Sequence, residues 1–191
     1  MREKSNSVRM ISIALLIAII VVLQVVSSLI KIGTFSITLT LIPIVVGAAM
    51  YGITAGAVLG AAFGVIVLIL CIMGLDPGGF ILWGINPFLT AGLCILKGVL
   101  AGAAAGLVFS LFSKKNLYLG VACAALVCPL VNTGIFIAGM MLCFQETLVA
   151  WAGGTSVLYF AFIGLTGVNF LIEVIVDVAF SPAVVRIIKA I

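Results

Sequence analysis

Three ionisable side chains lie deep inside apolar stretches of this sequence, where a charge is costly. Lys97 is about ten residues into the stretch 88–112, and Glu173 and Asp177 fall in the stretch 156–188. Each would cost roughly 2.5–3.5 kcal/mol at the centre of a membrane helix, so each needs a partner or a polar cavity. Glu173 and Asp177 are four residues apart and would therefore share one face of a helix.

These charges allow two interpretations. Lys97 either forms a salt bridge with Glu173 or Asp177 that joins two helices, or it holds the anionic group of a ligand. We expect Glu173 in a polar pocket, and Asp177 near the cytoplasmic interface in contact with water. Paired carboxylates would also suit an intramembrane enzyme, but the sequence has no histidine and no Ser-His or Cys-His arrangement. We therefore do not predict an enzyme.

Amide and hydroxyl side chains occur at a similar depth. Asn132 lies midway along the stretch 118–144, and Asn169 precedes Glu173 by one helical turn. A buried amide without partners costs roughly a few kcal/mol, so each amide is expected to bond to another helix or to a ligand. The candidate substrate-binding residues are Thr38, Asn86, Lys97, Asn132, Asn169 and Glu173.

The five cysteines give little support to a metal centre or a disulfide framework. They all lie within or beside apolar stretches, and no Cys-x-x-Cys pair occurs. A glycine-rich phosphate loop of the Gly-x4-Gly-Lys-Ser/Thr type is also absent from the sequence. We predict no metal and no cofactor, and any ATP-driven work must be powered by another protein.

Apolar stretches long enough to cross a membrane must position these residues. The sequence is 65% hydrophobic and 7% charged, which excludes a water-soluble domain. A hydrocarbon core about 30 Å thick is crossed by roughly 20 apolar residues in a helix. We predict an all-α integral membrane protein, with residues 1–191 as one compact bundle of six transmembrane helices near 9–30, 35–52, 54–74, 88–112, 118–144 and 156–188.

The basic residues predict the orientation in the membrane. Seven of them fall on one side of a six-helix topology, namely Arg2, Lys4, Arg9, Lys114, Lys115, Arg186 and Lys189. Lys31 is expected on the other side. The positive-inside rule then places both termini in the cytoplasm, in a multi-pass protein of a prokaryotic plasma membrane. The positive charge thus reflects topology and not a nucleic-acid partner, and the first apolar run is too long for a typical signal peptide.

Small residues recur every four positions in three of the predicted helices. Because residues four apart share one face, such rows allow two helices to approach closely in lipid. We expect the third and fourth helices to pack tightly through the glycines Gly52, Gly56, Gly60, Gly64, Gly98, Gly102 and Gly106. Ala14 and Ala18 form a smaller patch on the first helix, which could receive another helix.

Six segments of the sequence resemble those of known membrane proteins, namely 35–48, 51–64, 97–102, 132–136, 169–173 and 181–185. They are similar to segments of the substrate-binding S components of energy-coupling factor (ECF) vitamin transporters. The resemblance covers most of the chain, and it is strongest to the pantothenate-type branch. Leu41-Ile42 stands where that branch often has a histidine, so the identity of the vitamin stays open.

The resemblance implies a membrane-embedded receptor that captures a water-soluble vitamin, pantothenate before riboflavin or another micronutrient, from outside. Its partners would be a transmembrane coupling subunit, which docks on Ala14 and Ala18, and two cytoplasmic ATPases. Lys97 could pair with the vitamin carboxylate, with Glu173 orienting it. Asn132, Asn169 and Thr38 could bind hydroxyl and amide groups. The alternative is an autonomous secondary carrier, although the sequence shows no obvious inverted repeat.

Overall fold

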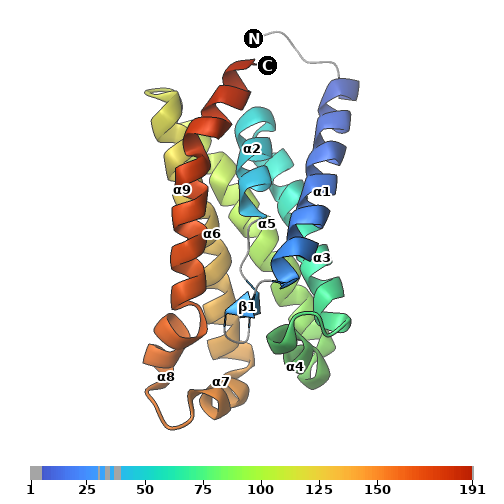
Figure 1. Ribbon diagram of the computed structural model, residues 1–191, viewed down its shortest axis with the longest axis vertical. Helices are drawn as coiled ribbons and strands as arrows, with labels where there is room; N and C mark the ends of the chain where they lie inside the picture. Colours follow the sequence, from blue (N-terminus) through green and yellow to red (C-terminus); the bar gives the residue numbers. More distant parts are fainter. Residues whose placement is uncertain (1–5, 30, 33–34, 37–39, 191) are drawn as a thin grey trace.

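The computed structural model of the chain describes residues 6–29, 31–32, 35–36 and 40–190, and it shows an elongated bundle of helices (Figure 1). The long helices run along the bundle axis, and α1 begins at the same end at which α9 finishes. The helical elements are α1 (Asn6–Leu29), α2 (Leu41–Tyr51), α3 (Ile53–Ile72), α4 (Pro77–Ile85), α5 (Pro87–Phe112), α6 (Leu117–Cys143), α7 (Gln145–Ala152), α8 (Val157–Tyr159), the π-helix η1 (Phe160–Leu165) and α9 (Gly167–Ala190).

Several of these helices are long enough to span a membrane. Among the described residues, four helices are long and apolar enough to cross a bilayer: Ser7–Ser28, Ile53–Ile72, Pro87–Phe112 and Leu117–Cys143. The count rises to five if Gln145–Ala152 and Val157–Leu165, which meet at a 94° bend, form one broken span. The chain is therefore a multi-pass helical membrane protein, and the expected number of six spans is not confirmed.

The predicted helix at 35–52 is wrong in its first part. Phe35–Ser36 is strand β2, which pairs antiparallel with β1 (Lys31–Ile32), and the helix begins only at Leu41. Residues 35–40 alternate apolar and polar side chains, a period of two that favours a strand. At about 1.5 Å per residue, the eleven residues of α2 reach roughly 16 Å, which is too short for the hydrocarbon core.

The predicted helix at 156–188 is also not continuous. It is divided into α8, η1 and α9, and the break falls at Thr166, whose hydroxyl donates to the carbonyl oxygen of Ala161 at 3.1 Å. Gly164 and Gly167 lie on either side of that break, and glycine weakens a helix interior. The wide turns of a π-helix are found frequently at functional sites.

Two short helices occupy segments that we expected to be breaks. One is α7, and the other is α4, which begins at a cap formed by Asp76. The Asp76 carboxylate accepts a hydrogen bond of 3.0 Å from the backbone N–H of Gly79, and Pro77 takes the first helical position. Capping aspartate followed by proline is a helix-start signal. The segment Asp76-Pro-Gly-Gly lies between the predicted spans 54–74 and 88–112, where no helix was predicted.

The closest helix contact is between α3 and α5. A Cβ atom built on Gly56 would overlap the carbonyl of Gly102, and one built on Gly60 would overlap the carbonyl of Gly98. Gly64 likewise lies against the backbone of Cys94. The two helices thus touch backbone to backbone, as small residues in four-residue spacing allow.

The terminal glycines of the two rows, Gly106 and Gly52, lie in different environments. Gly106 lies against the backbone of Ile53 at the start of α3. Gly52, which we expected inside the close contact, instead separates α2 from α3 with a φ of 85°. That backbone conformation favours glycine, because a Cβ atom is strained there.

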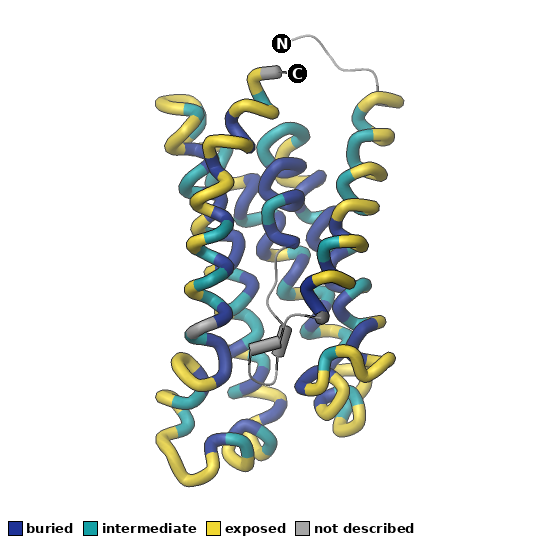
Figure 2. The backbone as a smooth tube through the Cα atoms, in the orientation of Figure 1, coloured by how far each residue is buried: buried dark blue, intermediate teal, exposed yellow. Residues whose placement is uncertain are grey.

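Buried residues line the inside of the bundle, and exposed residues cover its outer surface (Figure 2). Within the core, Ile44, Leu59 and Phe63 are completely buried. The outer face of α1 is exposed, including Ala14 and Ala18. An apolar exterior of this kind suits a lipid environment.

Candidate functional site

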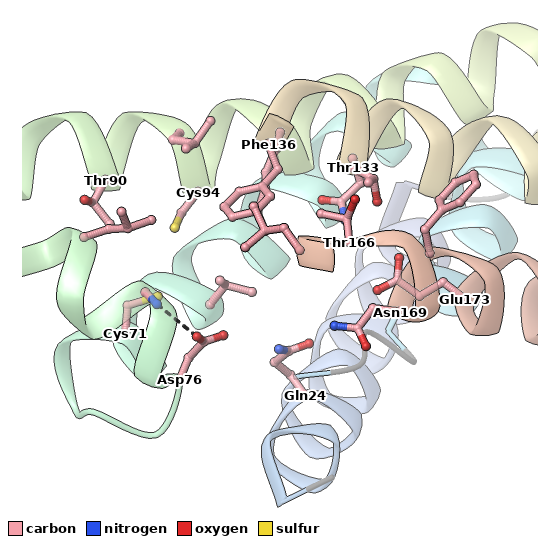
Figure 3. Close-up of a pocket in the computed structure, with 18 residues that line it drawn as sticks. Gln24, Cys71, Asp76, Thr90, Cys94, Thr133, Phe136, Thr166, Asn169 and Glu173 are labelled. Atoms are coloured by element: carbon pink, nitrogen blue, oxygen red, sulfur yellow. Dashed lines mark hydrogen bonds between the residues drawn. The ribbon is translucent and has the colours of Figure 1, made fainter. Parts of the chain in front are cut away.

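A cavity lies in the half of the bundle that is remote from the start of α1 and the end of α9 (Figure 3). Its walls come from α1, α3, α4, α5, α6, η1 and α9. It encloses about 770 Å³ of space not filled by atoms, including a part open to solvent, and water-sized spheres can be centred in about 80 Å³ of it. Mixed apolar walls with a few polar groups are typical of small-molecule sites.

Four of the predicted substrate-binding residues come together here. Lys97, Asn132, Asn169 and Glu173 all line the cavity. Asn86 does not line it: its side-chain oxygen caps α5 by accepting a 3.1 Å hydrogen bond from the N–H of Leu89. Thr38 lies outside the described residues.

Lys97 is held between two aromatic rings. Its ammonium nitrogen is 5.8 Å from the centroid of Phe63 on α3 and 5.3 Å from the centroid of Phe136 on α6. Cation–π contacts of this kind stabilise an ammonium group but leave its full charge. The Lys97 side chain thus lines the cavity between two aromatic rings.

Asn132 of α6 supplies a buried acceptor to the cavity. Its side chain is only 5% exposed, and its oxygen Oδ1 has no hydrogen-bond partner among the described residues. Asn169 and Glu173, at 9% and 4% exposure, add an amide and a carboxyl from α9 (Figure 3). Since buried polar groups are nearly always satisfied, the orphaned oxygen of Asn132 indicates that a donor from a ligand or from water pairs with it.

The prediction that Asp177 contacts water at the cytoplasmic interface is wrong. It is 2% exposed, it does not line the cavity, and in the described part of the chain neither of its carboxylate oxygens has a hydrogen-bond partner. Its place nine residues before Arg186 suggested the membrane interface. However, α6 and α2 pack against α9 and cover this face of the helix.

The structure adds polar residues that the sequence analysis did not select. Gln24 of α1 lines the cavity and accepts a 2.9 Å hydrogen bond from the hydroxyl of Thr40. Gln24 interrupts a long aliphatic run, and this signal could have identified it. The other polar additions are Asp76, Thr90, Thr133 and Thr166.

The cavity is suited to holding a polar molecule with groups of two kinds. Its lining includes an ammonium from α5, amide groups from α6 and α9, and the carboxyl groups of Asp76 and Glu173. Among the described residues, no cluster of three or more histidine, cysteine or acidic side chains could hold a metal ion. The arrangement supports reversible binding through charge and hydrogen bonds.

Comparison with known proteins gives one match. A family model described as "ECF transporter, substrate-specific component" matches residues 8–185. Neither the curated proteins nor the solved structures give a match.

Proposed function

Since the chain belongs to the family of ECF transporter substrate-specific components, we propose that it captures a water-soluble vitamin from outside the cell, with pantothenate as the favoured substrate. Proteins of this family bind substrates for transport and work with ECF transmembrane and ATPase modules. The proposal rests on one observation: Lys97 and Asn132 line the same cavity, and the side-chain oxygen of Asn132 has no hydrogen-bond partner among the described residues.

Pantothenate has chemical groups that complement the polar groups of the cavity. Its carboxylate would pair with Lys97, in a charge-assisted interaction that is stronger away from water. Its amide N–H and hydroxyl groups would donate to Asn132, Asn169 and Glu173. Of these three acceptors, the side-chain oxygen of Asn132 has no hydrogen-bond partner among the described residues.

A second class of substrate is favoured by one further observation. Asp76 and Glu173 bring two carboxyl groups to the cavity that also contains Lys97. A vitamin with a cationic group would therefore also find electrostatic partners. Riboflavin, which is uncharged in its ring system, would depend on the amide and hydroxyl groups instead.

A panel of vitamins tests the proposal. Detergent-purified protein is examined by native mass spectrometry for a co-purified ligand, and by thermal unfolding with each vitamin in turn. A ligand present at about 100 times its Kd stabilises the folded protein by about 2.7 kcal/mol, which is a readily measured shift. Stabilisation by pantothenate alone supports the favoured substrate, and stabilisation by another vitamin replaces it. No stabilisation by any vitamin contradicts the proposal.

The orientation in the membrane follows from the basic residues. Arg9, Lys114 and Arg186 lie near the start of α1, in the α5–α6 turn and near the end of α9, which gather at one end of the bundle (Figure 1). We place this basic end in the cytoplasm. The cavity then lies in the outer half of the membrane, where it can receive an external substrate.

The exposed alanines of α1 are the proposed contact with the coupling subunit. Replacing both Ala14 and Ala18 by leucine is expected to weaken assembly with the coupling and ATPase subunits at least about tenfold, because large side chains prevent close helix approach. Assembly is measured by co-purification from membranes. Vitamin binding by the isolated variant should not change, because neither alanine lines the cavity. Ala138→Leu, an exposed change on α6, is the control. Equal assembly by all variants would place the docking surface elsewhere.

Replacing Asn132 is expected to lower the vitamin affinity without lowering the stability of the protein. Asn132→Leu removes a buried oxygen that has no partner, so the unfolding temperature of the ligand-free protein should stay equal or rise, since such a group costs about 1–3 kcal/mol. Vitamin affinity should fall about tenfold, the equivalent of roughly 1.4 kcal/mol. Gly134→Ala on the same helix, where a Cβ meets no atom within 4 Å, is the control. Unchanged affinity in Asn132→Leu would remove this residue from the site.

A further inference from the structure

A second hollow lies on the opposite side of α1 from Ala14 and Ala18. This apolar groove runs between α1, α2 and α9, and its floor includes Leu16, Val46 and Phe180. It encloses about 1160 Å³ of space not filled by atoms, including a part open to the surroundings. Apart from Ser12 and Tyr51 its lining is apolar, so an apolar occupant fits it.

The groove has the depth of one membrane leaflet. On α1 its lining extends from Ser12 to Leu23, and on α9 from Val176 to Ile187. Each helix covers eleven steps of about 1.5 Å, or roughly 16 Å, close to half of a hydrocarbon core about 30 Å thick. Because α1 and α9 run in opposite directions, Ser12 and Ile187 lie at the same end, the basic end of the bundle (Figure 1).

A positive charge lies where the groove meets this end. Arg9 precedes Ser12 by one turn, and its Nη2 donates to the hydroxyl of Thr54 at 3.1 Å and to the carbonyl oxygen of Tyr51 at 3.5 Å. Tyr51 itself lines the groove. An apolar channel one leaflet deep, with the guanidinium group of Arg9 at its mouth, matches an acyl chain below a phosphate.

We propose that this groove binds one acyl chain of an anionic phospholipid from the leaflet at the basic end, with the lipid phosphate at Arg9. This inference goes beyond vitamin capture and does not depend on which vitamin is bound. The lipid site is separate from the proposed docking surface, because Ala14 and Ala18 do not line the groove. A bound lipid would fill the space between α1 and α9 while leaving the alanine face available.

Native mass spectrometry tests the lipid site. The protein in detergent is titrated with phosphatidylglycerol or with phosphatidylcholine that has the same acyl chains. We expect phosphatidylglycerol to be retained at least about tenfold more strongly, since both lipids fit the groove but only the first has a net negative headgroup. Arg9→Gln should remove this preference, whereas Lys114→Gln, an exposed change in the α5–α6 turn, should keep it.

A second variant tests the groove itself. Ile19 lines the groove and is 39% exposed, so Ile19→Trp can fill the space with little effect on the core. It should reduce retention of both lipids, and the thermal unfolding temperature verifies that the variant is folded. Equal retention of the two lipids by the wild-type protein, or equal effects of Arg9→Gln and Lys114→Gln, would overturn the proposal. Groove residues protected by a second copy of the chain, with no lipid retained, would also overturn it.

Discussion

Lys97→Gln is expected to lower the affinity for pantothenate about ten- to a hundredfold. The variant keeps a long side chain but loses the charge that lies between the rings of Phe63 and Phe136 and faces the cavity. A hydrogen bond to a charged group contributes about 1.5–3 kcal/mol, which corresponds to this change in Kd. Equilibrium binding by titration calorimetry in detergent measures the effect.

A substrate analogue distinguishes a ligand contact from a salt bridge that only joins helices. In the alcohol analogue of pantothenate, CH2OH replaces the carboxylate. The wild-type protein should prefer pantothenate to this alcohol, and Lys97→Gln should bind both with similar affinity. Lys114→Gln, remote from the cavity, should keep the wild-type preference. If the preference persists in Lys97→Gln, Lys97 does not bind the carboxylate.

Gly60→Ala is expected to destabilise the bundle by about 1–3 kcal/mol or more. The new methyl group would overlap the carbonyl of Gly98, and backbone cannot move aside as a flexible side chain can. Unfolding of the detergent-solubilised protein, followed by heat or denaturant, measures the loss. Gly92→Ala on α5 is the control, because a Cβ there meets no atom within 4 Å.

The control variant should behave in the opposite way. Alanine is favoured over glycine inside a helix by about 0.5–1 kcal/mol, so Gly92→Ala should be neutral or slightly stabilising. Equal stability of Gly60→Ala and Gly92→Ala would show that α3 and α5 are not in close contact in the membrane protein.

The long helices could be predicted from the sequence because the length of an apolar stretch determines whether it can span a membrane as a helix. The predicted 54–74, 88–112 and 118–144 differ from α3, α5 and α6 by no more than two residues at either end. The prediction failed at Phe35–Ser36, which is a strand, because hydropathy summed over the segment hid a two-residue alternation. It also failed at Thr166, because a π-helical turn depends on how neighbouring helices pack.

The site was partly predictable for a related reason. Lys97, Asn132, Asn169 and Glu173 were selected because polar groups in lipid require an explanation, and the structure brings them to one cavity. Asp177 was expected in contact with water but is buried, since its exposure could not be judged without knowing which helices cover α9. Asp76 was missed because it lies in a segment that we had assigned to a loop.

The backbone contact between α3 and α5 has a consequence for the empty and filled states of the cavity. At Gly56, Gly60, Gly98 and Gly102 there are no side chains that could adopt other rotamers, so the two helices have little freedom to slide or separate. Lys97 directly precedes Gly98, the backbone of Cys94 touches Gly64, and both line the cavity together with Cys71 of α3. This wall is stiff, and we expect accommodation of a ligand to take place among the larger and more adaptable cavity-lining side chains of α1, α6 and α9.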